Sequence, residues 1–247
     1  MTGTVLAVRD LAWRAGGVSI VAGVTFEVTD GEFLALIGPN GAGKTSLFNL
    51  ISGLVPASAG RIMLDGADVT REPAHRRARR GLGRTFQTSS VFGELTVAEN
   101  VRLAAAAHLG SCLRLYRRAD ASHAARAAAG EALDEVGLTP RADTPAGFLS
   151  HGDKRKLEVA ILLATDPRVI LLDEPMAGVG AADVPALAGV IRGLRRTVLM
   201  VEHNMGVLLD LADRVAVMHH GALLAIDTPE RVMADPTVQD AYLGEPL

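Results

Sequence analysis

Gly38 to Thr45 are the residues of this sequence whose types and spacing point most directly to a chemistry, and they read Gly-Pro-Asn-Gly-Ala-Gly-Lys-Thr. They fit the pattern G-x-x-x-x-G-K-[ST], in which glycines free the backbone so that successive N–H groups converge on phosphate oxygens. Lys44 would bring a positive charge to the β- and γ-phosphates, and the Thr45 hydroxyl would contact Mg²⁺. The segment follows the apolar run 33–37 and opens a helical pattern at 44–52, whose N-terminus favours anions. This context predicts a nucleotide phosphate site rather than a chance glycine-rich turn.

A second group of chemically capable residues is the carboxylate pair Asp173 and Glu174, which follows the apolar run 169–172. Ligands of open α/β sheets bind at the carboxyl ends of the strands, where these carboxylates would lie. Asp173 would hold Mg²⁺, directly or through a water molecule. Glu174 would polarise the attacking water as a general base, a role worth about 10²–10⁴-fold in rate. Alone, the pair could equally be a solvated turn, but the phosphate loop favours the functional interpretation.

The elements that must position these residues are visible as apolar patterns. Continuous apolar runs indicate strands that are buried on both faces. They are 33–37, 169–172 and 198–201. Residues 4–8 and 24–28 alternate as half-buried strands do, whereas 97–136 is rich in Ala, Leu and Arg at helical spacing. The pattern predicts an α/β fold, a P-loop NTPase core with a mainly parallel sheet, a small antiparallel β-subdomain and an inserted helical subdomain.

Shorter elements complete the expectation. Residues 60–70 predict a hairpin around Asp65 and Gly66, and 214–218 predicts a strand that leads to a turn. One closing helix is expected from about Pro229. We expect a single domain over 1–247. Its core would comprise 1–87 and 161–247, and its helical subdomain 88–160.

Three further segments resemble motifs of the ABC transporter ATPases. Residues 149–153 read Leu-Ser-His-Gly-Asp, which resembles the L-S-G-G-Q signature, and stand roughly 20 residues before Asp173. Gln87 follows Arg-Thr-Phe as in a Q-loop, and His203 follows Val-Glu like a switch histidine. With the phosphate loop and the acidic strand, these motifs occur in the family's order over nearly the whole chain. The sequence therefore resembles an ABC transporter nucleotide-binding subunit.

The resemblance implies a head-to-tail dimer that binds ATP and Mg²⁺ between subunits. Ser150 and Gly152 would face the partner's γ-phosphate, and Gln87 would sense Mg²⁺ and water. The residues expected at ATP are Gly38, Pro39, Asn40, Gly41, Ala42, Gly43, Lys44, Thr45, Ser46, Trp13, Ser150, His151, Gly152 and Asp153. Glu174, His203 and Gln87 are expected in catalysis, and Thr45, Gln87 and Asp173 at Mg²⁺.

The sequence departs from the family pattern at several positions. His151 and Asp153 replace the usual Gly and Gln of the signature, and 178–181 lacks the usual aspartate of the D-loop. The aromatic residue that usually stacks on adenine is missing near Ala15. Trp13 lies two residues earlier, where its ring could stack on adenine or cover the small sheet. The sequence leaves both roles open.

Within the family, several segments look like branched-chain amino acid importer ATPases. They are 78–87, 149–152, 174–178, 201–205 and 242–245. ATPases of urea and short-chain amide importers look nearly alike, and those of lipopolysaccharide exporters are close. The transported substrate would pass through the membrane subunits, so this chain indicates it only by likeness.

Composition limits the remaining alternatives. The net charge of −3 gives no global basic excess for nucleic acid, and the run of Arg76, Arg77, Arg79 and Arg80 is expected to be a solvated face. A soluble ABC ATPase acting on DNA or ribosomes would usually carry a second ATPase unit or inserted modules, and none is evident. A non-catalytic regulatory subunit is opposed by the intact Lys44.

The expected location follows from the same composition. No run of about 18 apolar residues and no signal-peptide pattern is present, and the single Cys112 suits a reducing compartment. We expect a peripheral protein on the cytoplasmic face of the membrane. Its partners would be transmembrane permease subunits, a second ATPase subunit and, indirectly, a periplasmic or extracellular substrate-binding protein.

Overall fold

The chain divides into two compact units in the computed structural model, which describes residues 3–85, 91–110 and 118–243. The first unit consists of Met1–Arg84, Arg168–Glu174 and Arg196–Leu247. The second consists of Thr85–Pro167 and Pro175–Arg195. The second unit thus contains the expected helical segment 88–160 together with a later stretch that the sequence patterns did not group with it.

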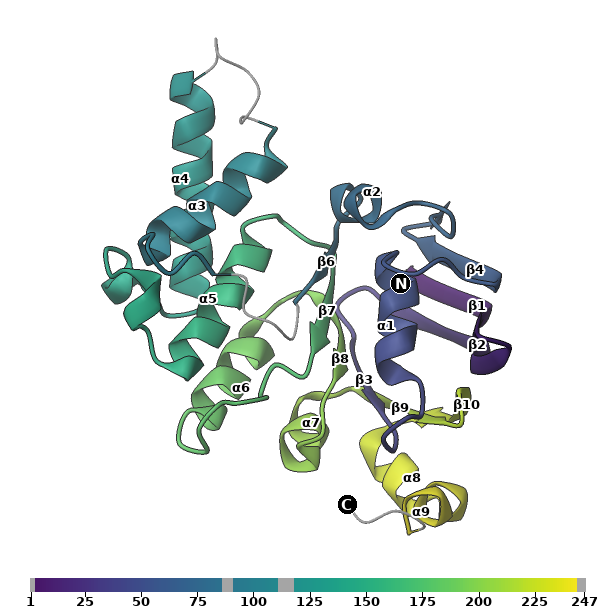
Figure 1. The fold of residues 1–247 in the computed structure, drawn as a ribbon. Coiled ribbons are helices and arrows are strands. Elements are labelled where there is room, and N and C mark those ends of the chain that lie inside the picture. Colours follow the sequence, from purple (N-terminus) through teal and green to yellow (C-terminus); the bar gives the residue numbers. More distant parts are fainter. Residues whose placement is uncertain (1–2, 86–90, 111–117, 244–247) are drawn as a thin grey trace. The chain divides into compact units, whose positions relative to one another are not determined.

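The first unit is built on a six-stranded sheet in the order β10-β9-β3-β8-β7-β6 (Figure 1). Its strands are β3 (Phe33–Ile37), β6 (Leu82–Arg84), β7 (Val169–Asp173), β8 (Thr197–Val201), β9 (Arg214–His219) and β10 (Ala222–Asp227). All neighbouring pairs are parallel except β9 and β10. Every residue of β3, β7 and β8 is buried, as their continuous apolar runs predict. The mainly parallel sheet is confirmed.

A smaller antiparallel sheet has the order β2-β1-β4-β5. Its strands are β1 (Thr4–Ala15), β2 (Val18–Thr29), β4 (Ala59–Leu64) and β5 (Ala67–Asp68). Residues 4–8 and 24–28 are only parts of β1 and β2, because register shifts break the simple alternation farther along. Asp65 and Gly66 form the expected turn between β4 and β5, both with positive φ.

The helix α1 (Lys44–Ser52) lies between the two sheets (Figure 1). Its side chains Leu47, Phe48 and Ile51 belong to one buried cluster with residues of both sheets. The helix ends at Gly53, whose left-handed backbone (φ 76°) places its N–H on the last carbonyls, as a glycine after a helix should. The core of this unit therefore fixes the helix that follows the phosphate loop.

The arginine run shows one correction to the sequence analysis. Three of the four arginines are exposed, but Arg77, in α2 (Ala74–Arg79), is only 2% exposed. Its guanidinium donates hydrogen bonds to the carbonyls of Leu50 and Ile51 at 2.6 and 2.7 Å, and to two more carbonyls before α2. Arg77 thus satisfies carbonyl groups at the end of α1, which is why this charge is buried rather than solvated.

The second unit is helical. Its helices are α3 (Val97–His108), α4 (Arg118–Glu135), α5 (His151–Leu163) and α6 (Val184–Gly193), with short turns η2 (Thr139–Arg141) and η3 (Ala146–Phe148). The helices α3, α4 and α5 pack against one another, and α6 packs on α5. A capping box at Thr96 and Glu99 begins α3. In the described part of the chain, no helix is long and apolar enough to cross a membrane.

The chain continues after β8 through α7 (Met205–Leu211) and closes with two helices, not the single one expected from Pro229. They are α8 (Pro229–Ala234) and α9 (Pro236–Leu243). Pro236 has no N–H to continue α8 and cannot be preceded comfortably by a helical residue, so Asp235 is extended and α9 begins anew.

Candidate nucleotide-binding and hydrolysis site

The phosphate loop lies between β3 and α1, where the sequence predicts it. Gly38 has φ +151°, and a Cβ atom there would come within 2.2 Å of the Met218 carbonyl oxygen in β9. Gly43 has φ +99°, and a Cβ atom there would come within 2.8 Å of the Ile20 carbonyl oxygen. Both positions therefore require glycine, for backbone conformation and for space.

Lys44 turns its ammonium group back onto this loop. Its Nζ donates hydrogen bonds to the carbonyl oxygens of Gly38 and Pro39, the latter at 3.0 Å, and the residue is 7% exposed. Gly43 is the N-cap of α1 and offers no side chain to the first N–H groups of the helix. The N–H groups at the N-terminus of α1 and the lysine charge together make an anion site that suits the phosphates of a nucleotide.

Asp173 is the last residue of β7, and its side chain is 1% exposed. Burial raises the pKa of its carboxyl group, while Arg84 opposes that shift with a hydrogen bond from Nη2 to Oδ2 at 2.9 Å. Arg84 is a residue of the site that the sequence analysis did not assign. Its partner is 89 positions away, and the only local signal is its place at the end of the short strand before Gln87.

Glu174 and His203 are brought together by the ends of β7 and β8. His203 Nε2 lies 3.0 Å from Glu174 Oε1, and both side chains are partly open to solvent. Glu174 has φ +50°, a strained conformation of the kind that occurs at functional sites. Glu202, which the sequence analysis did not single out, accepts hydrogen bonds from the N–H groups of His203 and Asn204 at 2.8 and 3.1 Å. Together, Glu174 and His203 can hold a water molecule, and Glu174 can take its proton.

The oxygen donors in this unit fit Mg²⁺. Thr45 offers a hydroxyl from the first turn of α1, and Asp173 offers a carboxylate. Across residues 3–85, 91–110 and 118–243, no three His, Cys, Asp or Glu side chains cluster as an all-protein metal site would require. Mg²⁺ commonly uses one or two protein oxygens and completes its shell with phosphates and water. Gln87, the other expected ligand, lies outside the described residues.

The signature residues belong to the second unit, at the start of α5. Ser150 is the N-cap of this helix, and its Oγ accepts a hydrogen bond from Asp153 N at 3.1 Å. Ser150 and His151 are exposed, whereas Gly152 is buried. A Cβ atom on Gly152 would lie 2.9 Å from Asp183 Cβ, so Asp183 is a neighbour of the signature that the sequence did not reveal. The exposed N-terminus of α5 can receive an anion.

Trp13 is partly buried and packs against the core cluster of the first unit. The strand ladder also shifts its register between Trp13 and Arg14, which interrupts the alternation that relates Trp13 to Ala15. This packing favours the role of covering the small sheet. Stacking of the ring on adenine stays a prediction.

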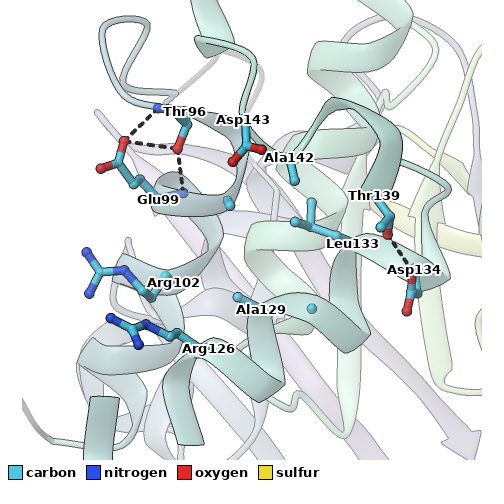
Figure 2. Close-up of a pocket in the computed structure, with 12 residues that line it drawn as sticks. Thr96, Glu99, Arg102, Arg126, Ala129, Leu133, Asp134, Thr139, Ala142 and Asp143 are labelled. Carbon is cyan, nitrogen blue, oxygen red and sulfur yellow. Dashed lines mark hydrogen bonds between the residues drawn. The ribbon is translucent and has the colours of Figure 1, made fainter. Parts of the chain in front are cut away.

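A pocket of about 520 Å³ in the second unit is separate from these motifs (Figure 2). It is lined by α3, α4 and residues 139–143, and Arg102 and Arg126 lie near each other on its wall (Figure 2). The lining also contains three carboxylates. Glu99 accepts a hydrogen bond from Thr96, Asp134 accepts one from Thr139, and Asp143 is the third. Three carboxylates and two arginines leave this lining without an excess of positive charge, so it suits a triphosphate less well than the phosphate loop does.

Comparisons with known proteins agree with this geometry. The model of the ABC transporter family matches residues 21–177, and that of the branched-chain amino acid ATP-binding cassette transporters matches 222–246. The chain belongs to the ABC transporter family, and it is an ATP-hydrolysing subunit of that class.

Individual relatives cover the chain almost entirely. The high-affinity branched-chain amino acid transport ATP-binding protein BraF of Pseudomonas aeruginosa is 39% identical over 99% of this chain and 100% of its own. The lipopolysaccharide export ATP-binding protein LptB of Haemophilus influenzae is 37% identical over 98% of both. The crystal structure of the ADP conformation of MJ1267, an ATP-binding cassette of an ABC transporter, superimposes with a TM-score of 0.86 at 29% identity, over 99% of this chain and 100% of that one.

Proposed function

We propose that this chain hydrolyses Mg²⁺-bound ATP to power an importer of branched-chain amino acids. The observation that carries the substrate is the match of residues 222–246 to the branched-chain amino acid cassette family. The overall identities to BraF and LptB are similar, at 39% and 37%, so the choice of import over lipopolysaccharide export rests on the family match of the C-terminal segment. Import of urea or a short-chain amide is the nearest alternative.

The proposed chemistry uses the groups described above. Lys44 and the N-terminus of α1 bind the phosphates, and Thr45 with Asp173 would hold Mg²⁺. The bound ion would supply positive charge that offsets the charge developing on the phosphates. Glu174 takes a proton from the attacking water, and His203, 3.0 Å away, orients the same water. Gln87 would complete the Mg²⁺ shell.

The proposed assembly is a head-to-tail dimer, with either a second copy or a related ATPase chain. Its support is the exposure of Ser150 and His151 at the N-terminus of α5, because an exposed helix N-terminus can bind a phosphate that another subunit holds. ATP would therefore be held by the phosphate loop of one subunit and by the signature residues of the other.

The proposed membrane partner is a permease, which would hold this chain at the cytoplasmic face and receive substrate from a binding protein outside. Phe92 and Phe148 are exposed by 62% and 82%. They flank Gly93 and Gly147, whose backbones touch through a hydrogen bond of 2.9 Å from Gly147 N. The buried amide of Asn100 fixes the backbone of Phe92 on both its N–H and its carbonyl oxygen. Exposed aromatic side chains on a hydrogen-bonded backbone suit an interface with a partner protein.

The first experiment is an affinity purification of Glu174→Gln from native membranes with ATP and Mg²⁺, followed by identification of the bound proteins. Polytopic membrane proteins and a related ATPase are expected. Uptake of labelled leucine and of labelled urea in cells that lack this chain then tests the substrate. Loss of urea uptake alone would replace the proposed substrate, and recovery of only ribosomal or DNA-repair proteins would overturn the transport function.

Phe92→Ser tests the proposed interface. It should reduce the stimulation of ATP hydrolysis by the permease and leave the hydrolysis of the isolated subunit unchanged. Leu109→Ser is the matched control, because Leu109 is also an exposed apolar residue (49%) but caps the other end of α3. Equal stimulation in both variants would argue against this interface.

A further inference from the structure

Arg84 is a buried cation beside the proposed Mg²⁺ ligand. Its side chain is 8% exposed, and that of its ion-pair partner Asp173 is 1% exposed. A charged carboxylate at such a buried position is stable only with a compensating charge and hydrogen bonds. Arg84 supplies both, through the 2.9 Å contact from Nη2 to Oδ2.

The same guanidinium also forms hydrogen bonds with the C-terminal end of α1, the helix that follows the phosphate loop. Nη1 of Arg84 donates to Asn49 Oδ1 at 2.8 Å and to Ser52 Oγ at 2.7 Å, both on the last turns of α1. Its Cζ atom lies 5.8 Å from the centre of the Phe48 ring. A cation is also favoured at this carboxyl end of the helix. The planar fork of arginine is needed for these contacts, since they diverge in direction.

These contacts link the two elements that carry Thr45 and Asp173, two of the three residues expected at Mg²⁺. Thr45 is on the first turn of α1, and Asp173 ends β7. Because α1 is one continuous helix, a residue that ties its last turn to Asp173 also sets where that carboxylate lies relative to Thr45. Groups that hold metal ligands in this way commonly change metal affinity by about 10–100-fold when they are removed.

We propose that Arg84 is a positioning residue for Mg²⁺: it holds the Asp173 carboxylate at a fixed place relative to α1, so that Mg²⁺ strengthens ATP binding. The proposal rests on the proposed function of binding Mg²⁺-bound ATP. It concerns how strongly Mg²⁺ and ATP assist each other, which is measurable without hydrolysis or transport.

The test compares ATP affinity with excess Mg²⁺ and with EDTA, by equilibrium binding, in the wild type and three variants. Arg84→Met should weaken binding of ATP with Mg²⁺ by about tenfold or more while affecting Mg²⁺-free ATP far less. Arg84→Lys keeps the positive charge but lacks the planar guanidinium, so its affinity for ATP with Mg²⁺ should lie between those of the wild type and Arg84→Met. Arg77→Met is the matched control, because Arg77 is also buried and bonded to the end of α1 but makes no described contact with Asp173.

The outcomes separate a positioning role from a structural one. Thermal melts of all variants establish folding, and Arg84→Lys keeps the test open if Arg84→Met fails to fold. An unchanged effect of Mg²⁺ in the folded Arg84 variants, or an equal loss in Arg77→Met, overturns the proposal. A wild type that shows the Mg²⁺ effect without hydrolysing ATP would contradict the proposed function and leave Arg84 tested independently.

Discussion

At the scale of single residues, hydrolysis is expected to depend on Glu174 and on His203, which lies 3.0 Å from it. Glu174→Gln keeps the shape of the side chain but removes the base, so hydrolysis should fall by about 10²–10⁴-fold. His203→Ala should also reduce the rate, since water would lose one of two groups that orient it. Phosphate release measures both effects, and ATP binding by Glu174→Gln should persist. Hydrolysis at the wild-type rate by Glu174→Gln would exclude this carboxylate as the base.

Gly152 leads to a second prediction at this scale. A methyl group at position 152 would lie 2.9 Å from Asp183 Cβ, which is rigidly attached to its backbone, so Gly152→Ala should cost about 1–3 kcal/mol of stability. Asp183→Gly removes the opposing atom, and it should cost little because the Asp183 side chain makes no cap hydrogen bond to α6.

The double variant Gly152→Ala with Asp183→Gly should therefore recover most of the stability in urea unfolding. Additive losses in the double variant would show that Asp183 is not the obstacle. ATP hydrolysis supplies a separate measurement. If stability returns and activity does not, Gly152 is needed for the close approach of phosphate as well.

Sequence motifs predict the reactive residues but not the residues that support them. The lysine, the carboxylate pair and the histidine occur in short patterns, so their types and spacing reveal them. Arg84, Glu202 and Asp183 act through contacts that no short pattern encodes. Arg77 shows the same limit, because an arginine among arginines predicts a solvated surface, whereas four backbone carbonyls hold this one inside.

At the scale of elements, the start of α3 depends on the capping box of Thr96 and Glu99. Thr96 Oγ1 accepts from Glu99 N at 3.2 Å, and Glu99 Oε2 accepts from Thr96 N at 2.9 Å. Thr96→Ala should lower the free energy of unfolding by about 1 kcal/mol, because the first turn of α3 loses its cap. Urea unfolding at neutral pH measures the loss. No change would mean that tertiary contacts alone hold this end of the helix.

Glu99 makes the same cap sensitive to pH. The hydrogen bond from the Thr96 backbone, followed by that from its side chain, lowers the pKa of Glu99 below its usual value of 4.5. A carboxyl group whose pKa is lowered by folding stabilises the native state above its unfolded pKa, and this stabilisation is lost as pH falls through the folded pKa. Glu99→Gln should therefore be less stable than the wild type at pH 7, and the difference should shrink below about pH 4.5. A difference that is independent of pH would contradict the role of the charge.

The observed bounds of strands and helices agree with the predicted ones where the local sequence signals are strong. The strand 33–37 and the helix 44–52 have the bounds that apolar pattern and terminal glycine predict. The long strands of the small sheet were only partly predicted, because bulges change which face a residue occupies. The short β6 has only three residues, too few for a period to be recognised, and its existence depends on pairing with β7.

At the scale of the whole molecule, the first unit holds the phosphate loop and the second holds the signature residues. The motif order identifies the family, but it cannot state which surfaces meet in an assembly, since an interface depends on two chains. The net charge of −3 leaves self-association unopposed by strong repulsion. Formation of the proposed dimer would therefore depend on ATP, which would supply the negative charge that both the phosphate loop and the N-terminus of α5 bind.

We expect the dimer to form only when ATP and Mg²⁺ are bound. With ATP and Mg²⁺, Glu174→Gln should have twice the monomer mass of 25.8 kDa in light scattering, alone or paired with a related ATPase, and should return to monomer with EDTA. Lys44→Ala in the same background should stay monomeric because it lacks the phosphate contact. Ser150→Phe, at an exposed position, should still bind ATP as a monomer but fail to dimerise, since the bulky ring would block the partner's phosphate. A dimer that forms without ATP, or that survives Ser150→Phe, would place the contact elsewhere and separate nucleotide binding from assembly.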